Sequence, residues 1–378
     1  MSNICFFLFV IFAFFFATQS VPVPATPHQN RAAKYGNGSR NFKNYNNRPK
    51  RPIPVTVVVP GGFERNIIPN TRRKPVSVNK GQAISIGALG SQRSLYGNGS
   101  SDTKFWGLTY SPYNTDGSCS DYKKVLSDLK VILTVTNRIR LYSTDCNQLE
   151  NVVKAITQNN LPMEVYAGIW ISDGAQRASN EIDTLIQVAK TYGSSVIKGI
   201  SVGNEELFKG SMSESELIAS INNARAAFSA AGLAGIPVYT TDTDANFTQN
   251  VANACDLIQV NIHTIYDTQR ASIDDLASSV VTRVRGVRSK IGGGKKVRIG
   301  ETGYSSAGST GARSGSLSSA SGYASRTTCL LKSANIEYFY FEAKDAVWKA
   351  GASQVEQNFG VFDANFQPKF DVSRLGSC

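Results

Sequence analysis

Two short stretches of the sequence each place a glutamate directly after an apolar run. VGNEE at 202–206 ends in Asn204, Glu205 and Glu206, and IGETGYSS at 299–306 contains Glu301. A helix cap and a first-turn acid give the first stretch an ordinary structural explanation. Two carboxyl groups that face each other across a cleft would instead suit cleavage of a glycosidic bond. One group protonates the leaving oxygen while the other attacks the anomeric carbon.

Aromatic and polar residues follow several other apolar runs. Aromatic rings in such places suit stacking on the flat faces of sugar rings, although core packing is the ordinary alternative. The aromatic candidates for substrate contact are Tyr110, Tyr142, Trp170, Tyr266, Tyr304 and Trp348, and the polar ones are Asn204, His263, Glu342 and Asp345. This set has one histidine, no cluster of metal ligands, no Ser-His-Asp order and no nucleophile elbow. It therefore lacks the residues for metal-dependent hydrolysis or acyl transfer.

Eight short strand-like runs alternate with longer amphipathic segments from residue 104 onward. Eight such units in about 275 residues are typical of a (β/α)8 TIM barrel, and near-continuous apolar strands fit a parallel sheet covered on both faces. An open doubly wound sheet is the main rival, but no glycine-rich phosphate fingerprint follows the first run. The expected strands are 104–110, 138–142, 163–171, 197–203, 236–241, 257–263, 296–302 and 336–342.

A barrel would bring the candidate residues together, because the carboxyl ends of its strands build one face. Glu205 would lie at the tip of the fourth strand and Glu301 at the tip of the seventh, 96 residues later. The expected chemistry requires two carboxylates and no cofactor or metal.

The first 102 residues have a different composition. Residues 1–20 contain the apolar run 4–17, which is short for a bilayer span and predicts a secretory signal peptide, with a retained anchor as the alternative. Residues 21–102 are rich in Asn, Pro and Gly and predict a disordered extension. They carry 13 basic and 2 acidic residues, so the extension holds +11 of the net charge of +12. We expect this tail to bind acidic cell-wall polymers rather than nucleic acid.

The cysteines and glycosylation sequons agree with secretion. Five of the six cysteines follow the signal segment and none has CxxC spacing, so we expect up to two disulfides and one remaining thiol, with 15 possible pairings. That thiol is either buried or a tether to another molecule. Three Asn-x-Ser/Thr sequons lie at Asn37, Asn98 and Asn246. The dibasic site Arg72-Arg73 is a candidate processing point.

Several motifs together resemble glycoside hydrolase family 17, above all the fungal secreted cell-wall β-1,3-glucanases and β-1,3-glucanosyltransferases. The resemblance covers residues 103–378, the expected glycoside hydrolase domain. The motifs are FWGLTYSPY at 105–113, RLYSTDC at 140–146, VGNEE, VNIHTIYD at 260–267, IGETGYSS and FYFEAKDAVWK at 339–349.

The resemblance implies a retaining mechanism in which Glu205 is the acid/base and Glu301 is the nucleophile, with carboxyl groups about 5 Å apart. It implies that Asn204 binds the sugar 2-hydroxyl group and that Tyr266 and Tyr304 position Glu301. It also implies that His263 supports its neighbours rather than carrying a proton, and it adds Lys349 to the substrate-binding candidates.

One segment departs from the family pattern. Fungal members commonly read close to FEAFDEPWK, whereas this chain has FEAKDAVWK, which introduces Lys344, Ala346 and Val347. Because the acidic residue at position 346 is lost, we expect linkage preference, chain-length preference or rate to differ from those of relatives.

Two alternatives remain open from the sequence. The intermediate can be resolved by water or by another glucan chain, so hydrolysis and transglycosylation use the same carboxylates. The basic tail, the unpaired thiol and the altered segment also fit a non-enzymatic cell-wall protein that binds glucan. We expect an extracellular, cell-wall enzyme with β-1,3-glucan polysaccharide or oligosaccharide as its partner.

Overall fold

The computed structural model describes residues 103–349, 351–376 and 378, without the side chain of Arg374. Eight parallel strands close into a barrel in the order of the chain. The predicted (β/α)8 TIM barrel is therefore confirmed. The strands are β1 (Gly107–Thr109), β2 (Arg138–Arg140), β3 (Glu164–Ile169), β4 (Ile197–Asn204), β5 (Val238–Thr243), β6 (Ile258–Asn261), β7 (Val297–Thr302) and β8 (Tyr338–Tyr340).

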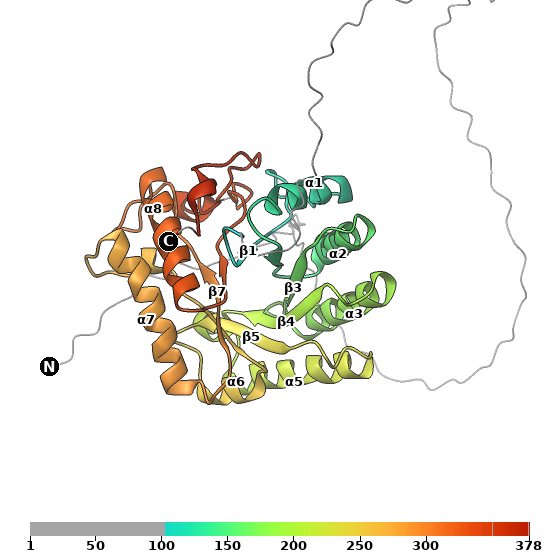
Figure 1. Ribbon diagram of the computed structural model, residues 1–378. Helices are drawn as coiled ribbons and strands as arrows, with labels where there is room; N and C mark the ends of the chain where they lie inside the picture. Colours follow the sequence, from blue (N-terminus) through green and yellow to red (C-terminus); the bar gives the residue numbers. More distant parts are fainter. Residues whose placement is uncertain (1–102, 350, 377) are drawn as a thin grey trace, which may run out of the picture. The chain divides into compact units, whose positions relative to one another are not determined.

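Helices surround the strands on the outside of the barrel (Figure 1). Their polar N-caps agree with the sequence, since Ser213 and Ser272 each begin a capping box. The α-helices are α1 (Tyr122–Ile132), α2 (Gln148–Gln158), α3 (Ala175–Tyr192), α4 (Glu206–Lys209), α5 (Glu214–Ala230), α6 (Gln249–Ala254), α7 (Ile273–Ile291), α8 (Leu317–Ser333) and α9 (Gln354–Gln357). Three 3-10 turns also occur: η1 (Asp145–Asn147), η2 (Thr264–Tyr266) and η3 (Val372–Arg374).

The hydrophobic core joins the strands to the inner faces of the helices. Leu108, Ile139 and Ile200 on the strands and Leu129 on α1 are all fully buried. Burial on both faces explains why the strand sequences are almost continuously apolar. The apolar period of three and four in the helices places one stripe on the barrel and leaves the opposite face polar.

The end of β4 has an unusual backbone that positions the residues after it. Gly203 has φ +80°, and a Cβ atom there would lie 2.8 Å from Cγ of Glu206. Two residues later, Glu205 has φ 62°. A non-glycine residue in the left-handed region is uncommon and often marks a functional position. This turn starts α4 immediately after the strand and places the Glu205 side chain at the carboxyl face of the barrel.

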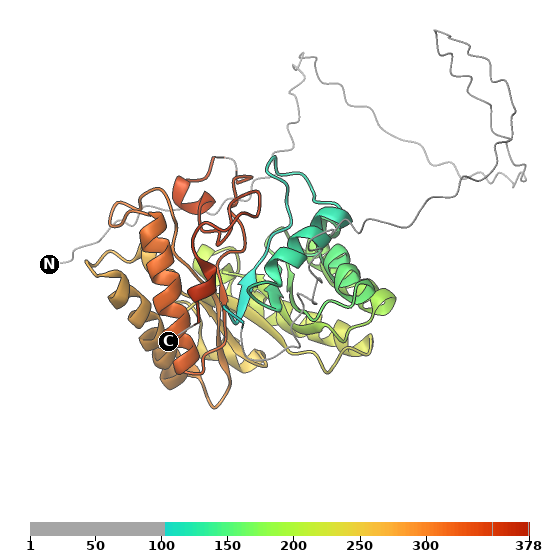
Figure 2. The same cartoon turned by 45° about the horizontal axis from the view of Figure 1, so that its top comes forward.

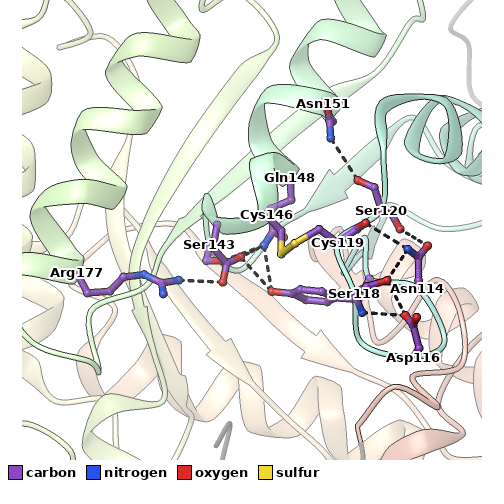
Figure 3. Close-up of a disulfide and its surroundings, with 12 residues drawn as sticks. Asn114, Asp116, Ser118, Cys119, Ser120, Ser143, Cys146, Gln148, Asn151 and Arg177 are labelled. Atoms are coloured by element: carbon purple, nitrogen blue, oxygen red, sulfur yellow. Dashed lines mark hydrogen bonds and ion pairs between the residues drawn. A yellow bond between two sulfur atoms is a disulfide. The ribbon is translucent and has the colours of Figure 1, made fainter. Parts of the chain in front are cut away.

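Among the described residues, two disulfides and one buried free thiol confirm the prediction for the five cysteines after the signal segment. The disulfides join Cys119 to Cys146 and Cys329 to Cys378, and Cys255 remains free. The first links the segment after β1 to the segment after β2 and is shown in Figure 3. The predicted signal peptide, basic extension, processing site and sequons Asn37 and Asn98 lie outside the described residues. No helix among the described residues combines the length and apolar character needed to cross a membrane.

Candidate active site

Glu205 is held at the tip of β4 by its neighbours on β5 and β6. Its backbone N–H donates to the carbonyl of Thr241 at 2.8 Å, and Nδ2 of Asn261 donates to Oε1 of its carboxyl group at 2.8 Å. The side chain is buried, with 7% of the residue exposed. Burial and the nearby charge of Glu301 raise the pKa of Glu205 above its ordinary value, against the lowering effect of the Asn261 hydrogen bond.

Glu301 lies on β7 and is surrounded by donors. Nη1 of Arg140 donates to Oε1 at 2.9 Å, and Nε2 of His263 lies 3.0 Å from Oε2. Burial opposes ionisation here too, but the His263 hydrogen bond and the charge of Arg140 outweigh it and lower the pKa of Glu301 to about 2. The pKa values of the two glutamates are therefore shifted in opposite directions. The upward shift favours the protonated form of Glu205, and the downward shift favours the ionised form of Glu301.

Arg140 on β2 connects residues of β4 and β7 in this site. It is 2% exposed, donates from Nη1 to the carbonyl of Gly300 at 2.9 Å and from Nη2 to Oδ1 of Asn204 at 2.7 Å, and stacks against the Tyr142 ring. A guanidinium group can make these contacts at the same time because its donors form a rigid planar fork.

Arg140 was not among the residues expected to form the site. Period-two alternation in RIRLY places Arg140 on the same strand face as Tyr142, which is the signal that could have identified it. Asn261 faces Glu301 in the β6–β7 register, a relationship that required the pairing of the strands.

His263 also contacts the aromatic residues around the site. Its ring lies 5.2 Å from that of Phe341 and 5.7 Å from that of Phe359, both in edge-on geometry. Burial lowers the pKa of His263, but the hydrogen bond and charge of Glu301 dominate and raise it. The contact of Nε2 with Oε2 places His263 directly beside the Glu301 carboxylate.

Glu342 and Lys349 form a second charged group beside Glu301. Nζ of Lys349 lies 3.5 Å from Oε1 of Glu342, which is buried at 3% exposure. Burial and the charges of Glu356 and Glu301 together raise the pKa of Glu342 to about 7, against the lowering effect of Lys349. The structure brings Glu342 and Lys349 to the site, as expected, and adds Glu356 on α9, which the sequence analysis did not identify.

Two tyrosines expected to position Glu301 have other partners. The hydroxyl of Tyr266 donates to Oε1 of Glu356, and that of Tyr304 lies 3.5 Å from the carbonyl of Ser314. The expectation was wrong in assigning the contact, since Arg140 and His263 hold Glu301 instead.

Tyr110 and Asp345, two of the substrate-contact candidates, have partners within the fold. Tyr110 is 0% exposed and its hydroxyl donates to Oδ2 of Asp128 at 2.8 Å, so no sugar can reach it. Asp345 accepts from Nζ of Lys369 at 2.6 Å and from the N–H of Gly360 at 2.9 Å. The predicted substrate contact of Tyr110 is therefore wrong, because a residue just past a strand end can turn into the packing behind the barrel face. For Asp345 these partners favour a structural role.

The other aromatic candidates lie on the carboxyl face and are partly exposed. Trp170 follows β3, and Nζ of Lys209 lies 4.9 Å from its ring. Trp348 packs against Tyr113 with ring centroids 4.6 Å apart. The Tyr142 ring packs against Arg140, whose Cζ atom lies 4.7 Å from the centroid of the ring. The three residues follow three different strands, β3, β8 and β2.

The three residues of the altered segment after β8 differ in exposure. Lys344 is buried at 6% exposure and lies 3.7 Å from Asp128, while Ala346 is fully buried and Val347 is 40% exposed. Burial lowers the pKa of Lys344. The contacts of Lys344 are therefore with Asp128 on α1 and with the carbonyl of Tyr113 in the segment after β1.

Of the three sequons, the one at Asn246 lies within the described residues. Asn246 lies in the segment between β5 and α6, and its Oδ1 accepts from Thr243 at 2.9 Å. Its glycosylation stays a prediction. Among the described residues, no group of three or more His, Cys, Asp or Glu side chains is placed to hold a metal ion.

Comparison with known proteins identifies the family of the chain. The model of the BtgE/BtgC glycoside hydrolase domain matches residues 107–360. The probable family 17 glucosidases SCW10 and SCW4 of Saccharomyces cerevisiae are 33% and 32% identical over 68% of this chain. The chain spans 65% and 64% of the length of these two relatives.

A solved structure agrees with this relationship. The family 17 β-1,3-glucanosyltransferase of Rhizomucor miehei is 27% identical, with a TM-score of 0.65 over 73% of this chain and 100% of its own. An active-site mutant of that enzyme in complex with laminaritriose gives a TM-score of 0.64 at the same identity. The chain therefore belongs to glycoside hydrolase family 17, within its BtgE/BtgC glycoside hydrolase domains.

Proposed function

We propose that this protein is a β-1,3-glucan-active enzyme that works by a retaining mechanism, with Glu205 as the acid/base and Glu301 as the nucleophile. The observation that carries this proposal is the opposite electrostatic setting of two neighbouring buried carboxyl groups. Glu301 accepts hydrogen bonds from Arg140 and His263, whereas Glu205 is buried beside the charge of Glu301. Related family 17 proteins named for β-1,3-glucan support the choice of substrate.

In the first step the Glu301 carboxylate attacks the anomeric carbon. The bond from that carbon to the glycosidic oxygen breaks, and the oxygen takes the proton of Glu205 as the leaving chain departs. The product is a glycosyl ester on Glu301, and Glu205 is now ionised. Arg140 loses part of its charge partner as the ester forms, but it retains Asn204 and the Gly300 carbonyl.

In the second step ionised Glu205 removes a proton from the incoming hydroxyl group. Its oxygen attacks the anomeric carbon, and the ester bond to Glu301 breaks, which restores both carboxyl groups. Water as the acceptor gives hydrolysis, and a sugar hydroxyl group gives glucanosyl transfer. Both outcomes use the same residues.

In the proposed mechanism, Asn204 binds the sugar that carries the reacting carbon. Its Oδ1 accepts from Arg140 at 2.7 Å and from Asn261 at 3.3 Å. The remaining Nδ2 group is then the donor available for the sugar 2-hydroxyl group. A hydrogen bond to that hydroxyl group strengthens in the transition state of glycoside hydrolysis.

The proposed location is the extracellular cell wall. The predicted signal peptide and the strongly basic composition of residues 21–102 support it, and the relative MP65 of Candida albicans is named a cell surface mannoprotein. The tail would bind acidic wall polymers and the barrel would act on glucan.

A time course with reduced laminari-oligosaccharides of defined length tests the proposal. The protein should convert them, with products longer than the substrate for a transferase and only shorter products for a hydrolase. Glu301→Gln, with its fold checked by circular dichroism, should abolish conversion. An unchanged substrate with tight glucan binding would contradict the enzyme proposal and favour a binding protein.

A further inference from the structure

Tyr113 and Trp348 form an aromatic pair on the carboxyl face of the barrel. Their ring centroids lie 4.6 Å apart with an interplanar angle of 44°, and both residues are partly exposed. They come from segments that are far apart in the sequence, one following β1 and the other following β8. In both ribbon views the red segment after β8 lies beside the segment that precedes α1 (Figures 1 and 2).

The Tyr113 side of the pair is held in place at several points. Its carbonyl oxygen accepts from Nζ of Lys344 at 2.8 Å, and its hydroxyl group donates to Oδ1 of Asp145 at 3.0 Å. Arg177 in turn donates to Asp145 at 3.0 Å. An antiparallel bridge joins Tyr113 to Cys119.

The disulfide of Cys119 with Cys146 ties this segment to the one after β2. Figure 3 shows the disulfide between Arg177 on one side and the turn of Asn114, Asp116 and Ser118 on the other. A ring that is fixed before a ligand arrives loses little conformational entropy on binding. The Tyr113 ring is therefore already ordered as a flat, partly exposed surface.

Lys349 and Glu342 connect the aromatic pair to the candidate active site. Trp348 is followed by Lys349, whose Nζ lies 3.5 Å from Glu342, and the charge of Glu342 interacts with that of Glu301. In a closed barrel of eight strands, β8 and β1 lie across from β4, which carries Glu205. Because Glu205 serves the leaving group in the proposed mechanism, the pair lies on the side that receives the donor part of the chain.

We propose that Tyr113 and Trp348 form a stacking subsite for a glucosyl unit of the donor chain, remote from the bond that is cleaved. The inference rests on the proposed function and adds a determinant of chain-length preference. Stacking uses the apolar face of the pyranose ring and the flat aromatic surface, and no bond forms or breaks there. Lys344, which departs from the family pattern, contributes by holding the Tyr113 carbonyl.

The test compares kcat/KM for laminariheptaose and for the shortest oligosaccharide that the protein cleaves. Tyr113→Ala and Trp348→Ala should each lower the value for laminariheptaose about tenfold, the equivalent of ~1.4 kcal/mol, and change the value for the short substrate less than about twofold. Tyr113→Phe retains the ring and should remain near the parent protein. Tyr192→Ala is the matched control, since Tyr192 also pairs with a carboxylate, Glu150, but ends α3 at the opposite face.

The position of the cleaved bond tests the placement on the donor side. With laminariheptaose labelled by reduction at its reducing end, loss of a remote donor subsite should shift initial cleavage towards the non-reducing end and give longer labelled fragments. Shorter labelled fragments, or equal losses on the short and long substrates, would overturn the inference. Those results require an active parent protein, so they remain distinct from a failure of the proposed function, in which the parent itself converts nothing. Should one alanine variant fail to fold, the other decides the question.

Discussion

Replacing Arg140 by glutamine should move the acidic limb of the pH–rate profile to higher pH. Arg140 donates a 2.9 Å hydrogen bond to Glu301, and the two side chains are only 2% and 7% exposed. A hydrogen bond to a charged group contributes roughly 1.5–3 kcal/mol, and one pKa unit corresponds to about 1.4 kcal/mol. Losing the contact should therefore raise the pKa of Glu301, which lies at about 2, by roughly one to two units.

The direction of the shift follows from the proposed role of Glu301 as the nucleophile. The nucleophile must be ionised, so kcat/KM rises with pH as Glu301 loses its proton, and a higher pKa moves that rise upward. The assay is kcat/KM on laminari-oligosaccharides from pH 2 to 7, with return to pH 5 after each exposure to check for irreversible loss. Arg138→Gln is the control, because it removes the same charge from the same strand but pairs with Glu164. If a folded Arg140→Gln variant retained the parent acidic limb, the proposed support of Glu301 would be refuted.

Three further substitutions separate catalytic from structural residues. Glu205→Gln should lower kcat about a hundredfold or more and remove the alkaline limb, because the raised pKa of Glu205 otherwise sets the pH at which its proton is lost; a retained alkaline limb in the pH profile would contradict this. Tyr110→Phe removes the hydrogen bond to Asp128, so the free energy of unfolding measured by urea titration should fall by about 1 kcal/mol while kcat/KM stays unchanged. A large loss of activity would instead indicate that Tyr110 contacts the substrate. Asp345→Asn leaves Lys369 without its buried charge partner and should cost about 3 kcal/mol of stability, measured by thermal and urea unfolding, while the folded fraction keeps its activity.

The barrel was predictable because its signals are local. Eight apolar runs at regular spacing, separated by amphipathic segments, indicate a parallel sheet covered by helices, and each expected strand corresponds to one of β1 to β8. The same topology placed Glu205 and Glu301 on one face. The presence of two disulfides followed from composition, but their pairing required the fold, since Cys329 and Cys378 are 49 residues apart.

The contacts within the site were less predictable. Tyr110 follows β1 in the sequence as an active-site residue would, yet its hydroxyl turns back to Asp128 on α1. Asp345 was expected to contact the substrate from its motif, but its carboxylate forms an ion pair with Lys369. The direction of a side chain just past a strand end depends on the local turn and on packing from distant segments, and neither is written in the spacing of a motif.

Arg140 is the opposite case, since it lies in the site although the sequence did not predict it there. A basic residue in a short strand reads as an exposed edge position, but the barrel closes around it and supplies acceptors from β4 and β7. Glu301 and Asn204 are 161 and 64 positions away in sequence, so no local pattern joins them. Alternation along β2 indicates the face on which Arg140 lies, and only the strand order reveals its partners.

The most direct test of the account is to trap the glycosyl-enzyme intermediate. An activated laminaribiosyl donor with fluorine at C2 slows release of the intermediate, and digestion followed by mass spectrometry identifies the residue that carries the sugar. We expect an adduct of one disaccharide on Glu301, and none on the Glu301→Gln variant. An adduct on a different residue, or turnover of natural glucan by a protein that never forms one, would contradict the assignment of Glu301 as the nucleophile of a retaining enzyme.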